Sequence, residues 1–303
     1  MTIVALGSIN MDLVIKAPRL PSAGETLMGH EFFSAFGGKG ANQAVAVAKL
    51  GHAVEFVGQV GGDDFGQTLL LALNVAGVNT DGVSINPKAH SGVASIVVSE
   101  NGENTIACAA GANGTVGEAE ITYFKNRLGR IKVALLELGI PLTTVLEAAR
   151  TAREAGVTTI LDPAPIPDTF PEELYGFVDI ITPNELEAGQ LVGFEVNDRE
   201  TATRAAAALQ EKGAKTVIIT LGEQGALCVG EDTFWQPATP VEAVDTVAAG
   251  DAFNGAFAVA LAEGKSLPEA MRWGAIAGSL TVTKMGAQSS LPDRGAFLKA
   301  LKG

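Results

Sequence analysis

Short apolar runs rich in β-branched residues alternate with longer stretches rich in Ala and Leu along most of the chain. The apolar runs predict strands at residues 3–6, 54–60, 133–138, 157–161, 178–182 and 217–221. The stretches between them predict helices at 41–50, 65–76, 142–155, 199–212, 252–263 and 267–284, several of which end at Gly. This repetition predicts an α/β fold, a doubly wound, mostly parallel sheet flanked by helices, in a single domain over residues 1–303.

Two segments interrupt this alternation. Residues 12–36 contain Pro18 and Pro21 and show little helical pattern, while residues 91–109 alternate in a strand-like way around Asn101-Gly102. Together they predict a small antiparallel β lid beside a ligand cleft at the carboxyl ends of the parallel strands. The exposed edges and outer face of such a sheet need covering, so we expect a homodimer formed through the lid.

Composition narrows the class of protein. The chain has 303 residues, 47% of them hydrophobic, which is ample for a large core. A formal net charge of -13 disfavours nucleic-acid binding. The first residues lack the basic region of a signal peptide and no apolar run approaches the ~20 residues of a membrane span, so we expect a soluble, cytoplasmic protein. Cys108 and Cys228 lack metal-site spacing, and both are predicted to be buried thiols.

Residues 245–257 place a glycine turn and a carboxylate at the start of an apolar helix. Ala248, Ala249 and Gly250 are small enough for backbone N–H groups to approach an anion, which the positive end of the helix dipole also attracts. Asp251 would face a nucleophile approaching that anion. The stretch therefore suits phosphoryl transfer, where positioning and charge neutralisation dominate. An ordinary helix cap remains the alternative.

Two segments near the start of the chain suit a polyol ligand. Asn10 and Asp12 would lie on the same side of an extended chain, where an amide and a carboxylate can hold adjacent hydroxyls. Three glycines surround Lys39 just before a predicted helix that contains Asn42. This glycine-rich stretch fits neither a Walker loop nor a dinucleotide fingerprint. A plain Asx turn explains the first segment equally well, and glycine-rich turns before helices are common.

Two later segments suit a nucleotide. A helix starting after residues 178–182 would hold Asn184 and Glu187 at i, i+3, where they could serve Mg²⁺ or phosphates, although a capping box predicts the same letters. The stretch from Thr220 through Gly222 to Gly225 runs from a strand into a glycine turn, as in a nucleotide-lining loop or a simple hairpin.

The order of these motifs resembles the PfkB-type carbohydrate kinase family, in particular its ribokinase-like branch, over essentially the whole chain. The family pattern Asn-x-Asp is met at residues 10–12, Gly-Gly-Lys-Gly-Ala-Asn at 37–42, and Asp-Thr-x-Ala-Ala-Gly-Asp at 245–251. The resemblance implies ATP-dependent transfer of the γ-phosphate to the primary hydroxyl of a sugar, with ribose expected first. The alternatives are a kinase of another sugar or a nucleoside (fructose, keto-deoxygluconate, adenosine or pseudouridine) and, less expected, a catalytically silent sugar-binding protein.

The resemblance also implies residue roles. Asp251 would be the catalytic base, and Ala248, Ala249 and Gly250 would complete the anion hole. The sugar would be held by Asn10, Asp12, Gly38, Lys39, Asn42 and Asp251. The ATP site would be lined by Asn184, Glu187, Thr220, Gly222, Gly225 and Gly250, with Glu187 organising Mg²⁺ through water. An activating K⁺ would be bound by Asp245, Val247, Thr281, Lys284, Gly286 and Ser290.

One position departs from the family pattern Gln-Leu-Glu-x-Pro before Pro141. Gly139 stands where the sugar-contacting Glu is expected. Glu137 lies two residues earlier and would point to the same side of a strand. It is therefore a candidate sugar contact in place of the missing carboxylate, and the departure could also mark a different substrate.

Overall fold

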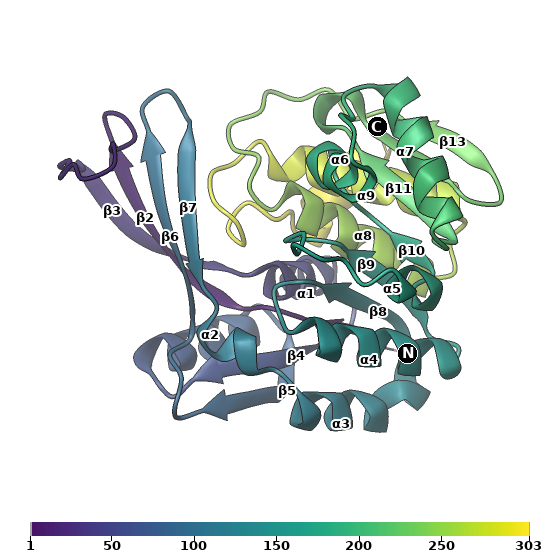
Figure 1. Ribbon diagram of the computed structural model, residues 1–303, viewed down its shortest axis with the longest axis horizontal. Coiled ribbons are helices and arrows are strands. Elements are labelled where there is room, and N and C mark those ends of the chain that lie inside the picture. Colours follow the sequence, from purple (N-terminus) through teal and green to yellow (C-terminus); the bar gives the residue numbers. More distant parts are fainter. Residues whose placement is uncertain (1, 303) are drawn as a thin grey trace.

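The computed structural model describes residues 2–302 and contains two sheets (Figure 1). The larger has nine strands in the order β13-β12-β11-β10-β9-β8-β1-β4-β5. These are β1 (Thr2–Leu6), β4 (Val54–Gly61), β5 (Asn79–Asn86), β8 (Ile131–Glu137), β9 (Thr158–Asp162), β10 (Ile180–Ile181), β11 (Thr216–Thr220), β12 (Ala226–Val229) and β13 (Thr233–Gln236). Pairing is parallel from β11 to β5 and antiparallel where β12 and β13 extend one edge.

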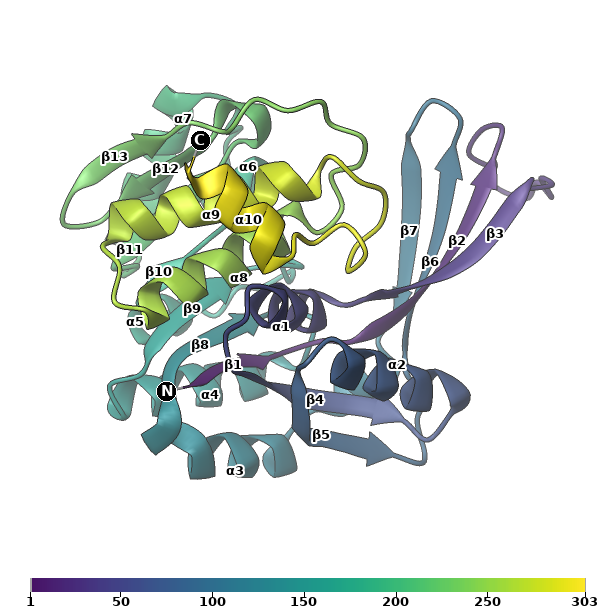
Figure 2. The ribbon, with the colours of Figure 1, turned by 180° about the vertical axis from the view of Figure 1, so that it is seen from behind.

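Helices cover both faces of this sheet, as Figures 1 and 2 show from opposite sides. One face carries α1 (Lys39–Lys49), α2 (Asp64–Val75), α8 (Ala249–Ala262), α9 (Leu267–Thr281) and α10 (Arg294–Lys302). The other carries α3 (Glu118–Arg127), α4 (Leu142–Glu154), α5 (Glu173–Phe177), α6 (Glu185–Val192) and α7 (Arg199–Glu211). Alternate residues of each strand feed the two cores, so that Ile3 packs on one side of β1 and Val4 on the other. The predicted doubly wound α/β fold is confirmed.

The predicted strands and helices are all present, with ends shifted by up to three residues. The expected strand at 178–182 shortens to the two residues of β10. Patterning did not indicate β5, β12, β13, α3, α5 or α10. The outermost strands β5 and β13 mix exposed and half-buried residues, which blurs the apolar run that marks a central strand.

The second sheet is the lid, which rises from one side of the molecule (Figure 1). Its strands are β2 (Asn10–Ala17), β3 (Glu31–Gly37), β6 (Gly92–Ser99) and β7 (Asn104–Ala109), in the order β3-β2-β6-β7. Both hairpins are antiparallel, and they join through a parallel β2–β6 pairing that the sequence did not indicate. Gly102, with φ of +85°, lies in the predicted hairpin turn.

The lid also corrects one prediction. Cys228 is buried as expected, but Cys108 is exposed. It lies on β7, an edge strand whose six residues are all exposed, and an edge strand of a thin sheet offers little cover for a thiol. Within residues 2–302, none of the helices combines the length and apolarity that crossing a membrane requires.

Candidate active site

Glycines bring the start of α1 against the turn that follows β1. Gly38 has φ of +91°, and a Cβ on it would lie 2.5 Å from the Cα of Ile9. A Cβ on Gly40 would lie 2.8 Å from the Cα of Gly7. Neither position has room for a side chain, since real Cβ atoms do not approach backbone so closely. The predicted glycine-rich stretch therefore serves close backbone packing at the carboxyl end of β1.

The β2 residues Asn10 and Asp12 point toward this region from the base of the lid. A Cβ on Gly37 would overlap the Asp12 carboxylate, so Gly37 makes room for it. The Asn10 Oδ1 accepts a hydrogen bond of 2.7 Å from the Nδ2 of Asn113, which also holds the backbone of Ile9. Asn113 supports a predicted site residue, and sequence reasoning missed it because it comes from a short 3₁₀ helix, Gly111–Thr115, about 100 residues away.

The carboxyl of Asp251 lies in the first turn of α8 and is buried. Its Oδ2 accepts a hydrogen bond of 2.9 Å from the Asn42 Nδ2, and its Oδ1 accepts one of 3.2 Å from the Gln43 Nε2. The same Gln43 nitrogen donates to Asp162 Oδ2 at 2.9 Å, and the Lys39 Nζ lies 3.5 Å from that oxygen. The structure thus gathers three predicted residues, Lys39, Asn42 and Asp251, with two that the sequence analysis missed, Gln43 and Asp162.

Electrostatics in this cluster are unusual. Burial raises the pKa of Asp251, against the effects of Lys39 and of the two amide donors. Burial also raises the pKa of Asp162 to about 8, although Lys39 again opposes the shift. Burial and the nearby Asp251 carboxylate raise the pKa of Asp12 to about 7. A group of carboxyls with strongly perturbed pKa values, two of which interact with Lys39, is typical of functional sites.

The N-terminus of α8 offers backbone donors to an anion. Ala248, which precedes the helix, has φ of 61°, the single non-glycine residue with positive φ among residues 2–302. The Ala249 N–H donates to the Thr246 carbonyl at 3.3 Å. The next amides, of Gly250 and Asp251, belong to the first turn, where a helix provides no acceptors. Above Gly250 there is open space, so these amides and the helix dipole suit an anion.

The two predicted nucleotide segments are adjacent. Asn184 and Glu187 form a reciprocal capping box at the start of α6, with hydrogen bonds of 2.8 and 3.0 Å. Asn184 is bridged to Thr220, after which Gly222 and Gly225 form a turn between β11 and β12. The capping box and the hairpin that the sequence left open as alternatives are both present. Contact with a nucleotide remains a prediction, although the Glu187 carboxylate is close enough to help raise the pKa of Lys39 above its usual range, against the lowering effect of burial.

The six positions implied for K⁺ lie on two chain segments that meet. Asp245 accepts hydrogen bonds from the backbone N–H groups of Val247 at 3.0 Å and of Gly286 at 2.8 Å. Thr281 and Ser290 are buried, and the Lys284 N–H donates to the Thr281 carbonyl. The segments present carbonyl, hydroxyl and carboxylate oxygens, a donor set that fits a hard cation.

Gly139, which stands where the family pattern has Glu, lies directly against the Glu137 carboxylate. Glu137 is fully buried, and its carboxylate accepts hydrogen bonds from the backbone N–H of Ser8 and, at 2.7 Å, from that of Gly139. A Cβ on Gly139 would lie 2.8 Å from both the Glu137 Oε2 and the Ser8 Oγ. Glu137 therefore supports the turn after β1 with both carboxylate oxygens. Its contact with a sugar remains a prediction.

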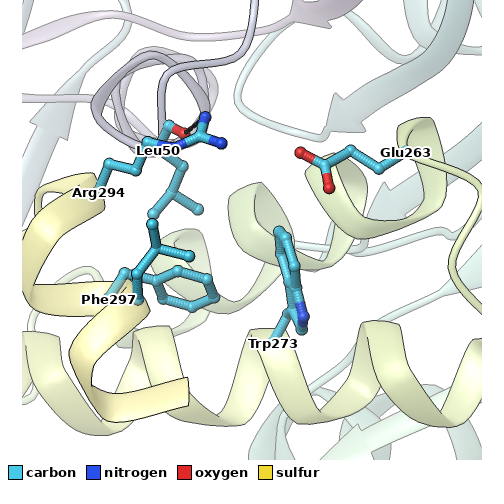
Figure 3. A pocket seen from close by; sticks show the side chains of 6 residues that line it. Leu50, Glu263, Trp273, Arg294 and Phe297 are labelled. Carbon is cyan, nitrogen blue, oxygen red and sulfur yellow. Dashed lines mark hydrogen bonds between the residues drawn. The ribbon is translucent and has the colours of Figure 1, made fainter. Parts of the chain in front are cut away.

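A separate small hollow lies between α9 and α10 and the end of α8 (Figure 3). Trp273 and Arg294 are among the side chains that line it. Its volume of about 10 Å³ is no more than one water molecule needs, so it is not a substrate site.

Residues 1–294 match the family model described as pfkB family carbohydrate kinase, and the chain belongs to this family of carbohydrate kinases. It is 42% identical to the ribokinase of Haemophilus influenzae over 303 residues, which cover 99% of this chain and 98% of that protein. It is 36% identical to the deoxyribokinase of Salmonella typhi, with 97% and 96% of the two chains covered. The structure of Arabidopsis thaliana ribokinase complexed with ribose and ATP superposes with a TM-score of 0.91 at 35% identity, covering 100% of this chain and 98% of that one.

Proposed function

We propose that this protein transfers the γ-phosphate of ATP to the primary hydroxyl of D-ribose and forms ribose 5-phosphate. The observation that carries the proposal is the buried Asp251 carboxyl, held by Asn42 and Gln43 beside the amides that begin α8. The similarity to ribokinases over nearly the full chain supports the choice of sugar. We place the activity in the cytoplasm, where ATP is supplied.

In the proposed reaction the ribose hydroxyl oxygen attacks the γ-phosphorus. The bond from that phosphorus to the β,γ-bridging oxygen breaks, and its electron pair leaves with ADP. Asp251 accepts the hydroxyl proton, and the first-turn amides of α8, with Ala248, Ala249 and Gly250, stabilise charge on the transferring phosphoryl group. The Asp251 side chain supplies no covalent step; it positions the hydroxyl and removes its proton.

Two sets of residues would hold the substrates. Asn10 and Asp12 from β2, with Gly38, Lys39 and Asn42 at the start of α1, would hold the sugar, because they offer the acceptors and donors that sugar hydroxyls require. ATP would lie along the adjacent segments that contain Asn184, Thr220, Gly222 and Gly225, with its phosphates toward Gly250.

Two cations fit this arrangement. Mg²⁺ bound with ATP would neutralise charge on the phosphates, and Glu187 would hold it through water. K⁺ would be held by the oxygens of the Asp245 and Gly286 segments, where its charge would strengthen the anion hole without touching the sugar. We expect K⁺ to raise turnover, and equal rates with and without K⁺ would remove it from the proposal.

We also propose a homodimer through the lid. Large apolar side chains are exposed on its strands, with Phe32 at 65% and Ile106 at 52% exposure. Such side chains on a thin sheet favour pairing with a second copy. Light scattering with size exclusion at micromolar concentration should give twice the chain mass, and a single-chain mass throughout would contradict the dimer.

The test of function is coupled ADP release with Mg-ATP and K⁺ over ribose, deoxyribose, fructose, common nucleosides and keto-deoxygluconate. The blank is Asp251→Ala, for which we expect a loss of about 10²–10⁴-fold in turnover with ATP affinity retained. Highest kcat/KM on ribose would support the proposal. Highest kcat/KM on another compound would refute the substrate and keep the family, and Gly139 would then be the first position to examine. Wild-type turnover in Asp251→Ala would refute the mechanism.

A further inference from the structure

Gln43 is a buried polar residue that contacts two carboxyl groups of the site. It is fully buried on α1, and its amide nitrogen donates to two carboxyl groups, Asp162 at 2.9 Å and Asp251 at 3.2 Å. A primary amide has two N–H donors, so one nitrogen can serve both acceptors. Gln43 thus directly links Asp251, the proposed base, to Asp162 at the end of β9.

The contacts favour one orientation of this amide when the two carboxyls are ionised. Rotating it by half a turn would bring the Oε1 of Gln43 against the carboxyl oxygens of Asp162 and Asp251, which are acceptors when ionised. Asp162 therefore fixes the direction in which the amide points, and Lys39 in turn lies 3.5 Å from Asp162. On the other side, Asn42 holds the second oxygen of Asp251. The Asp251 carboxyl is held at both oxygens by adjacent residues of one helix.

We propose that Gln43 is a positioning residue for phosphoryl transfer, which orients the Asp251 carboxyl toward the sugar hydroxyl, and that Asp162 holds Gln43 in the required orientation. The inference rests on the proposed function, because it assumes that Asp251 takes the proton. Each carboxylate oxygen has two lone pairs, so the amide bonds fix the group and still leave it able to accept a proton. Because Gln43 acts through Asp251, and Asp251 is only one of six proposed sugar contacts, the loss of Gln43 should lower kcat far more than it changes substrate binding.

The first measurement compares Gln43→Leu with the control Gln59→Leu. Gln59 is also a buried glutamine that donates to a hydroxyl and a carboxylate, Ser84 at 2.9 Å and Glu120 at 3.4 Å, but it has no contact with Asp251. We expect Gln43→Leu to lower kcat about 10- to 100-fold with both KM values within about threefold of wild type, since small misplacements of a reacting group cost that much. Gln59→Leu should keep the wild-type kcat.

The second variant, Asp162→Asn, keeps the shape of the side chain and therefore guards against a folding failure of Gln43→Leu. Lys39 from α1, Glu137 from β8, Glu187 from α6 and Asp251 from α8 are the charged groups that influence Asp162. Neighbouring acids titrate as a pair, so removing one lets the other ionise more easily. We expect kcat to fall about three- to tenfold and the acid limb of its pH profile to move to lower pH.

The outcomes separate the inference from the function on which it rests. A wild-type protein that phosphorylates no compound in the panel refutes the proposed function. An active wild type combined with unchanged kcat and pH profile in both variants refutes the role of Gln43. A rise in sugar KM at constant kcat also refutes it, because that result would make Gln43 a binding residue.

Discussion

Helices α1 and α8 must approach closely for Asn42 and Gln43 to reach Asp251, and Gly255 is the residue that permits the approach. A Cβ on Gly255 would lie 2.6 Å from the Cβ of Ala46 and 3.1 Å from the carbonyl oxygen of Gln43. Comfortable carbon contacts are about 3.5–4.0 Å, so Gly255→Ala would force the helices apart by about 1 Å.

Two effects on stability oppose each other in this variant. Replacing Gly by Ala in a helix interior gains about 1 kcal/mol from backbone entropy. Overpacking costs about 1–3 kcal/mol. We therefore expect the free energy of unfolding to fall by about 0–2 kcal/mol in urea titrations. The larger effect should be on catalysis, because a shift of about 1 Å between Gln43 and Asp251 lowers kcat about 10²-fold.

Gly176 provides the control for this experiment. It lies in α5, and a Cβ on it would meet no atom within 4 Å, so Gly176→Ala should gain up to about 1 kcal/mol with kcat unchanged. Gly255→Ala could instead raise the free energy of unfolding as much as Gly176→Ala does and keep the wild-type kcat. The interface between α1 and α8 would then tolerate an extra methyl group, and close packing would not be what positions Asp251.

Two further predictions concern other parts of the site. The pKa of Asp12 is raised to about 7 in the folded protein, so the folded state favours the protonated carboxyl. The contribution of this group to the free energy of unfolding is therefore fully present below pH about 4 and is lost as the pH rises to about 7. Asp12→Asn should therefore raise Tm relative to wild type by an amount that grows from pH 4 and levels off above pH 7, while sugar KM rises; a pH-independent change in Tm would contradict this. Ala248 has φ of 61°, a left-handed conformation that costs a residue with a Cβ about 1–2 kcal/mol. Gly avoids this strain but loses more backbone entropy on folding, which costs about 0.5–1 kcal/mol. Ala248→Gly should thus leave the free energy of unfolding equal or raise it by about 1 kcal/mol in urea titrations, and a loss above 1 kcal/mol would show that the Ala248 methyl group packs favourably.

The sequence was sufficient to predict the sheet, the helix layers, the lid and three residues of the group around Asp251, namely Lys39, Asn42 and Asp251 itself. Each of these follows from a local pattern: apolar periodicity for the elements, and short glycine-containing stretches with polar residues for Lys39, Asn42 and Asp251. The pairing of α1 with α8 is different in kind, since it joins residues about 200 positions apart. Local patterns carry no information about such a contact, and the resemblance implied only that Asn42 and Asp251 both hold the sugar.

Gln43 and Asp162 were missed for different reasons. Gln43 follows Asn42 in a helix, where a polar residue next to a motif looks like ordinary surface. Asp162 had a usable signal, because it ends a buried parallel strand, and ligands of open α/β sheets bind at the carboxyl ends of such strands. The same rule applied systematically to the strand at 157–161 would have found it.

The substitution at residue 139 shows why single positions are poor evidence for substrate choice. A Cβ at 139 would press on the Glu137 carboxyl, and a Cβ at residue 7 would overlap that carboxyl from another side. Gly7, Glu137 and Gly139 therefore depend on one another, since the buried carboxylate requires both glycines. The resemblance implies an amide at residue 137 and a carboxylate at residue 139, whereas this chain has its carboxylate at residue 137. A Glu restored at 139 alone would displace Glu137 from the backbone amides of Ser8 and Gly139. A variant that tests the effect of this position on sugar preference must therefore change residues 137 and 139 together.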